Sequence, residues 1–162
     1  MLRILKMAAL LASAAFAAIA IYINLVEQPS RLLLEDRALL AQWAASYPAG
    51  MKIQGALAIL AGLSAIGAFY FSRNWLWLVG GVLMLANWPY TLFVIYPVNA
   101  ALLAMAAGAP SEAARMLIEQ WGWLHAVRSA LGAVATLLFL SAWNANLASC
   151  SLRGPSGSQR AG

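Results

Sequence analysis

The chain has 162 residues, of which 64% are hydrophobic and only 9% are charged. Because a soluble domain is roughly half apolar and a quarter charged, this composition excludes an ordinary water-soluble protein and indicates an integral membrane protein. The net charge of +5 does not indicate nucleic-acid binding, since the basic residues are scattered and flank the apolar segments, as topology signals do.

Apolar segments of about 20 residues, enough for a helix to cross a ~30 Å hydrocarbon core, predict four membrane spans. They cover residues 7–26, 53–71, 75–96 and 124–143. Backbone groups in lipid must bond internally, so we expect an all-α, antiparallel four-helix bundle over residues 1–146. The first segment resembles a signal peptide, but its apolar run is too long, and we expect a retained helix. We expect the polar segment 147–162 to be a disordered tail.

The connections between the spans predict which ends lie together. Residues 72–74 form a tight hairpin, so the long connections, 27–52 and 97–123, emerge on the opposite face. Within them, 30–46 and 111–121 have the pattern of short amphipathic helices capping that end, the second with Ser111 as its N-cap. The other face carries basic residues without nearby acids, which places both termini in the cytoplasm.

A faint internal repeat accompanies this layout. "QWAASY" (42–47) precedes the second span and "QWGWLH" (120–125) precedes the fourth, each with a tyrosine or histidine four residues after the tryptophan. Pro29 and Pro97 each follow an odd-numbered span. The pattern predicts two parallel halves, each a span, a capping helix and a span, with chance similarity as the alternative.

Polar side chains in mid-membrane are costly, so they mark the place to look for function. Counting ~1.5 Å per residue along each span places several of them at one level, toward the outer leaflet. They are Asn24 and Glu27 of the first span, Asn87 and Tyr90 of the third, and Trp121, His125 and Arg128 of the fourth, with Asn99 just beyond the third. We therefore expect one polar and aromatic pocket open to that leaflet.

The same residues also permit a purely structural interpretation. Arg128 and Glu27 are the expected ion pair, since a charge at that depth needs a partner. His125 shares a face with Arg128 by its i,i+3 spacing and should therefore point inward with it. With one histidine and one cysteine in the chain, the sequence does not support a metal site.

Three motifs follow one another along nearly the whole chain before the tail: "YINLVEQPSRL", "NWPYTLFVIYPVNAALL" and "QWGWLHAVRSALG". In this order they resemble the anthrone oxygenase-like family of small four-helix membrane proteins. The most specific are Pro97, Asn99 and Leu102, and the series Trp121, His125 and Arg128. The resemblance implies the fold, and the alanine-rich chain is most similar to bacterial members, which implies the inner membrane.

The family's chemistry implies oxidation of an apolar, anthrone-like aromatic by dioxygen, with no cofactor. His125 is then the base, Asn99 or Tyr90 the hydrogen-bond donor to a developing oxyanion, and Trp121 the wall. Arg128, Asn87 and Asn24 complete a substrate-binding pocket, and the partners are membrane lipids and a hydrophobic small molecule. The alternative is a protein without catalysis that binds a lipid or quinone, or belongs to a larger membrane complex.

Overall fold

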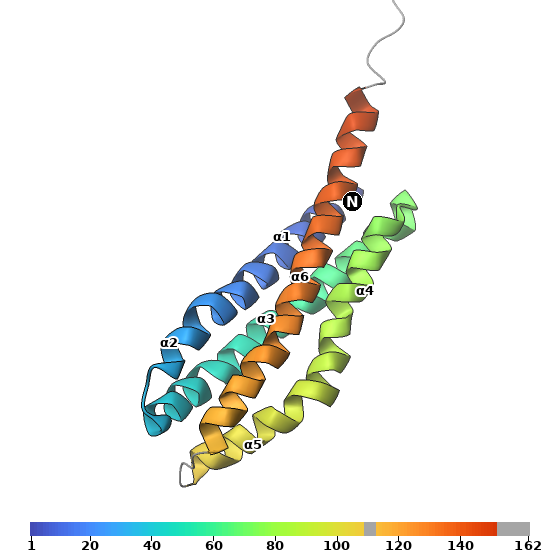
Figure 1. The fold of residues 1–162 in the computed structure, drawn as a ribbon. Helices are drawn as coiled ribbons and strands as arrows, with labels where there is room; N and C mark the ends of the chain where they lie inside the picture. Colours follow the sequence, from blue (N-terminus) through green and yellow to red (C-terminus); the bar gives the residue numbers. More distant parts are fainter. Residues whose placement is uncertain (109–112, 152–162) are drawn as a thin grey trace, which may run out of the picture.

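Four helical rods form an antiparallel bundle (Figure 1). The computed structural model describes residues 1–108 and 113–151. The first rod consists of α1 (Leu2–Tyr22), the π-helix η1 (Ile23–Glu27) and α2 (Gln28–Leu32), and the second is α3 (Asp36–Ser72). The third consists of α4 (Trp75–Tyr90), the π-helix η2 (Thr91–Ile95) and α5 (Tyr96–Ala107), and the fourth is α6 (Ala113–Ser151). In this described part, four helices are long and apolar enough to cross a membrane. The predicted all-α bundle of a multi-pass membrane protein is confirmed.

The short hairpin expected at residues 72–74 joins α3 to α4. The first helix ends at Ser72, after which Arg73 adopts a left-handed backbone conformation with φ of 54°. The second begins because the side-chain oxygen of Asn74 accepts a hydrogen bond from the backbone N–H of Leu76 at 3.0 Å. The beginning of α1 lies at this same end of the bundle (Figure 1).

The opposite end brings the two long connections together, as predicted. Arg115 of α6 forms an ion pair with Asp36 of α3 at 2.6 Å and donates to the carbonyls of Leu32 and Leu34. Of the segments expected to cap this end, residues 36–46 and 113–121 are helical, and each is continuous with the span that follows it, in α3 and in α6. Residues 30–32 belong instead to α2, and residues 33–35 form the turn before α3. Ser111, the expected N-cap, lies outside the described residues.

Within the described residues, two hydrophobic cores hold the rods together. The alanine core lies toward the hairpin end and consists mainly of alanines around Phe16, Trp77, Met84 and Phe139. Here glycines allow α3 and α4 to approach closely. A Cβ added to Gly62 would lie only 3.1 Å from the carbonyl oxygen of Gly81. The second core, which we call the aromatic core, lies at the other end and contains Leu39, Leu40, Trp43, Ile95, Val98, Leu102, Ala114, Ile118 and Trp121.

The two π-helices give the predicted repeat a structural counterpart. Each is five residues long, and each leads into an α-helix whose second residue is a proline, Pro29 or Pro97. Proline lacks an N–H and its ring crowds the preceding turn, which a wider π turn accommodates. The third rod changes direction in this region, so that α5 runs across the end of the bundle (Figure 1).

The last helix reaches Ser151, and so enters the segment 147–162 that we expect to be disordered. Residues 152–162 of that segment lie outside the described residues.

Candidate functional site

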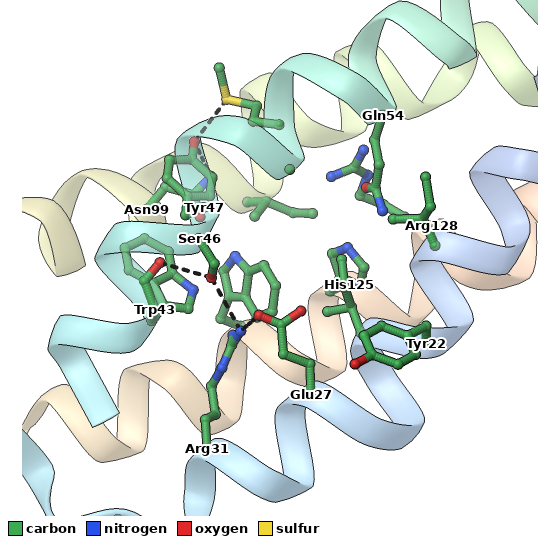
Figure 2. Close-up of a pocket in the computed structure, with 16 residues that line it drawn as sticks. Tyr22, Glu27, Arg31, Trp43, Ser46, Tyr47, Gln54, Asn99, His125 and Arg128 are labelled. Atoms are coloured by element: carbon green, nitrogen blue, oxygen red, sulfur yellow. Dashed lines mark hydrogen bonds and ion pairs between the residues drawn. The ribbon is translucent and has the colours of Figure 1, made fainter. Parts of the chain in front are cut away.

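A cavity of about 240 Å³ lies beside the aromatic core, which contributes Trp43, Ile95 and Trp121 to its wall, and all four rods line it (Figure 2). Its lining is largely aromatic and apolar, with a few polar groups, as in pockets that bind small organic ligands. The lining residues are Ile19, Tyr22, Ile23, Glu27, Arg31, Trp43, Ser46, Tyr47, Gly50, Met51, Gln54, Ile95, Asn99, Trp121, His125 and Arg128. Tyr22 and Met51 are exposed on the bundle surface, so the cavity opens beside them.

His125 lines this cavity and is only 1% exposed, as expected of a side chain that points inward. Its Nδ1 lies 2.9 Å from Oδ1 of Asn24. The orientation of the Asn24 amide is fixed, because its Nδ2 donates to the carbonyl of Gly122 and its Oδ1 accepts from the hydroxyl of Ser129. Nδ1 of His125 therefore carries the hydrogen, and Nε2, which makes no hydrogen bond with the described residues, keeps its lone pair.

A stacked aromatic pair holds the imidazole from one side. The rings of Trp121 and His125 lie 4.7 Å apart with an interplanar angle of 23°. Trp43 and Tyr47 of α3 form a second stacked pair at 4.8 Å and 8°. The two tryptophans meet edge to face at 6.0 Å, so the pairs share one wall of the cavity.

The Tyr47 hydroxyl is a hydrogen-bond donor without a strong acceptor. It accepts a hydrogen bond from Nδ2 of Asn99 at 3.0 Å, and its own proton points to the sulfur of Met51 at 2.9 Å. A thioether is a weak acceptor. The phenol is thus oriented as a donor that a ligand oxygen could engage in place of the sulfur.

Arg128 does not form the expected ion pair with Glu27. Glu27 pairs with Arg31, four residues along the same rod, and also accepts from Gln42 of α3. The guanidinium of Arg128 lies 5.5 Å from the Phe16 ring and has no ion-pair partner among the described residues. Figure 2 shows it apart from the Glu27–Arg31 pair. An unneutralised cation thus remains at the cavity.

Two other expected site residues face away from this cavity. The hydroxyl of Tyr90 donates to the carbonyl of Leu124 at 3.1 Å, which ties α4 to α6 and uses its proton. Asn87 donates to two carbonyls of its own helix and lines a second, smaller cavity. Neither Tyr90 nor Asn87 is among the residues that line the cavity of about 240 Å³. Asn24 accepts a hydrogen bond from Nδ1 of His125 and so positions the imidazole.

Several residues that the sequence analysis did not assign to the pocket line it. Trp43 and Tyr47 entered the sequence analysis only as part of the internal repeat, and Arg31, Ser46 and Gln54 were not considered. The available signal was the repeat, because Trp43 and Tyr47 occupy the same places in "QWAASY" as Trp121 and His125 in "QWGWLH".

Buried polar atoms without partners gather around this cavity. The donors are Nε of Arg31 and Arg128, Nε1 of Trp43 and Trp121, and Nε2 of Gln54, and the acceptor is Oδ1 of Asn99; none has a hydrogen-bond partner in the described part of the chain. Buried polar groups normally have partners, so such a concentration indicates a ligand site. Donors outnumber acceptors, which favours a ligand that carries oxygen acceptors.

The described residues contain no group of three or more histidine, cysteine, aspartate or glutamate side chains that could hold a metal ion.

Comparison with known proteins identifies relatives. The sequence model of the anthrone oxygenase family matches residues 43–138, which include both stacked pairs. An anthrone oxygenase of Cryptosporiopsis sp. (strain 8999) is 31% identical over 105 residues, covering 62% of this chain and 61% of the relative. An anthrone oxygenase of Claviceps purpurea (strain 20.1) is 35% identical over 109 residues, covering 60% and 63%.

The chain thus spans somewhat less than two thirds of the length of the curated relatives it matches. No solved structure matches it significantly.

Proposed function

Because this chain belongs to the anthrone oxygenase family, we propose that its cavity binds an anthrone-like substrate and oxidises it with dioxygen. Such a substrate is a rigid aromatic ketone with a CH₂ group between two rings. It is apolar enough to arrive through the membrane, and its ketone oxygen can accept a hydrogen bond from the unpartnered donors of the lining. The cavity of about 240 Å³ suits a small rigid molecule.

The observation that carries the proposal is the pairing of a free base with unpartnered donors. Nε2 of His125 makes no hydrogen bond to the described residues, and the Arg128 Nε–H is buried without a partner. Removing a proton from the CH₂ group produces an enolate, whose negative charge spreads onto the ketone oxygen. Such a proton transfer requires a base to take the proton and a cation or hydrogen-bond donor to stabilise the anion that forms.

The reaction then balances with dioxygen alone. His125 takes a proton from the CH₂ carbon, and the resulting carbanion passes one electron to O₂, giving a carbon radical and superoxide. These combine into a C–O bond, and the peroxide takes a proton. Loss of water, with removal of the second C–H proton, leaves a carbonyl at that carbon. One anthrone and one O₂ give one anthraquinone and one water.

Tyr47 and Arg128 take the role that we expected of Asn99 or Tyr90. The Tyr47 hydroxyl donates to the ketone oxygen as charge develops there, in place of its weak bond to Met51. Asn99 positions this hydroxyl by donating to its oxygen. Arg128 stabilises the anion electrostatically, an effect that is large where water is excluded.

The test is the oxidation of anthrone by the full-length protein in detergent or liposomes under ¹⁸O₂. We expect faster formation of anthraquinone than in protein-free detergent, with one ¹⁸O atom incorporated at the former CH₂ carbon. Anthrone that binds but is not oxidised faster than in the protein-free control would contradict the proposal. That result would favour the alternative, a protein that only binds an apolar small molecule.

A further inference from the structure

A second cavity of about 90 Å³ lies beside the first, between α3 and the third rod. Its wall includes Gly55 and Ala58 of α3, and Asn87, Trp88, Thr91, Leu92 and Tyr96 of the third rod. Met51 and Arg128 line both cavities. The two spaces are therefore neighbours that share the unpaired cation in their wall.

The size and lining of this cavity limit what could occupy it. It has well under half the volume of the first cavity, so a three-ring aromatic is too large for it. Its wall is mostly apolar, and Trp88, Leu92 and Tyr96 are exposed on the bundle surface, where lipid would lie. Small apolar cavities in proteins take up apolar molecules such as xenon rather than water.

We propose that this second cavity is the dioxygen site of the reaction. This inference rests on the proposed function, which supplies the need for O₂. Dioxygen is small and apolar, and it can enter from the lipid through the exposed side. It is then bound next to Arg128 while the larger cavity holds the carbanion.

The position of Arg128 gives the site a chemical role. When the carbanion passes an electron to O₂, superoxide forms and carries a new negative charge. A guanidinium without an anionic partner in the described residues attracts that charge strongly in a medium of low dielectric. The same cation thus stabilises the enolate from one cavity and superoxide from the other.

Besides the Arg128 guanidinium, the polar atom in the wall that argues against an apolar ligand is Oδ1 of Asn87. It is buried, lines the second cavity and has no partner among the described residues. Water bonded to this oxygen and to Arg128 is the competing occupant. The experiment must therefore distinguish a gas from water.

The first measurement uses xenon and needs no turnover. We expect xenon under pressure to bind between α3 and η2 in the intact protein, detected by ¹²⁹Xe NMR or by diffraction from a pressurised crystal. Ala58→Leu, which extends a buried side chain into the cavity, should abolish this binding. Absence of xenon, or ordered water in its place, would overturn the proposal whether or not the protein oxidises anthrone.

The second measurement varies dissolved O₂ at saturating anthrone. Ala58→Leu should raise the KM for O₂ at least several-fold and leave the KM for anthrone unchanged. The matched control is Ala56→Leu, the same change on the exposed face of α3. A rise in the KM for anthrone without a rise for O₂ would also overturn the proposal. If anthrone is not a substrate at all, the proposed function fails, and the xenon result still decides whether this cavity takes up an apolar gas.

Discussion

The two halves of the chain build similar scaffolds and place different chemistry on them. In the first half Trp43 stacks on Tyr47, and in the second Trp121 stacks on His125, each pair four residues apart on a long helix. Each second member is bound by an asparagine from the other half, Asn99 for the tyrosine and Asn24 for the histidine. A repeated frame thus presents a donor and a base to one cavity, and the halves depend on each other.

The difference three residues further along is equally informative. Gly50 follows Tyr47 as Arg128 follows His125, and both line the cavity. A Cβ built on Gly50 meets nothing within 4 Å, so the first half leaves space where the second places a cation. One half thus leaves open space at the cavity, and the other half places a positive charge there.

Removal of the base should have the largest effect. His125→Gln keeps a polar side chain that can still bond to Asn24, so we expect helical content and thermal stability to change little. Anthrone oxidation should fall by roughly 10²–10⁴-fold, the usual contribution of a general base. The measurement is O₂ consumption together with circular dichroism. Equal losses of activity and of stability would reduce His125 to a structural residue.

Removal of the donor in the other half should cost less. Tyr47→Phe keeps the stack on Trp43 and deletes the hydroxyl, and we expect kcat to fall by about 10²-fold, the lower range for an oxyanion donor. Tyr90→Phe is the matched control, because its hydroxyl donates to the Leu124 carbonyl outside the cavity. It should leave kcat nearly unchanged. A larger loss in Tyr90→Phe than in Tyr47→Phe would reverse the assignment.

Filling the space of the first half should separate binding from folding. Gly50→Leu introduces a side chain where the built Cβ meets nothing, and it replaces a glycine within a helix, which stabilises by up to about 1 kcal/mol. We expect weaker anthrone binding, measured as a higher Kd, with an unchanged or higher melting temperature. Gly50→Ala is the conservative control. Unaltered binding in Gly50→Leu would show that the ligand does not enter this cavity.

The smallest expected effect is a difference in the free energy of unfolding between variants of Arg31 and of Arg128. Arg31→Met leaves Glu27 partly buried without its ion-pair partner, and should lower the free energy of unfolding by about 1–3 kcal/mol. Arg128→Met breaks no ion pair among the described residues and keeps an apolar stem near Phe16, so stability should change less. Thermal denaturation of both variants measures the difference. Greater destabilisation in Arg128→Met would restore the ion pair that we expected from the sequence.

The sequence predicted the bundle well because composition and segment length determine which parts can cross a membrane. The hairpin at 72–74 and the shared end of the long connections followed from the same reasoning. The inward direction of His125 followed from its i,i+3 spacing to Arg128. Depth along each span is only one coordinate, however. It placed Tyr90 and Asn87 at the level of the pocket but could not give the direction in which each side chain points.

The π-helices explain part of what was missed. An ordinary α-helix over residues 23–27 would place Asn24 and Glu27 on one face by their i,i+3 spacing. The wider turn of η1 separates them: Asn24 and Gln28 bond to α6, and Glu27 turns toward Gln42 of α3. The expected ion pair between Glu27 and Arg128 therefore does not form. Glu27 pairs instead with Arg31, four residues further along the same rod.

The most direct test of the central claim is proton exchange without oxygen. Full-length protein is incubated anaerobically with anthrone in D₂O, and deuterium entering the CH₂ group is followed by NMR. If His125 removes this proton, the wild type should accelerate exchange above the protein-free rate, and His125→Gln should not. Exchange at the protein-free rate in the wild type, or equal acceleration by the variant, would contradict the account.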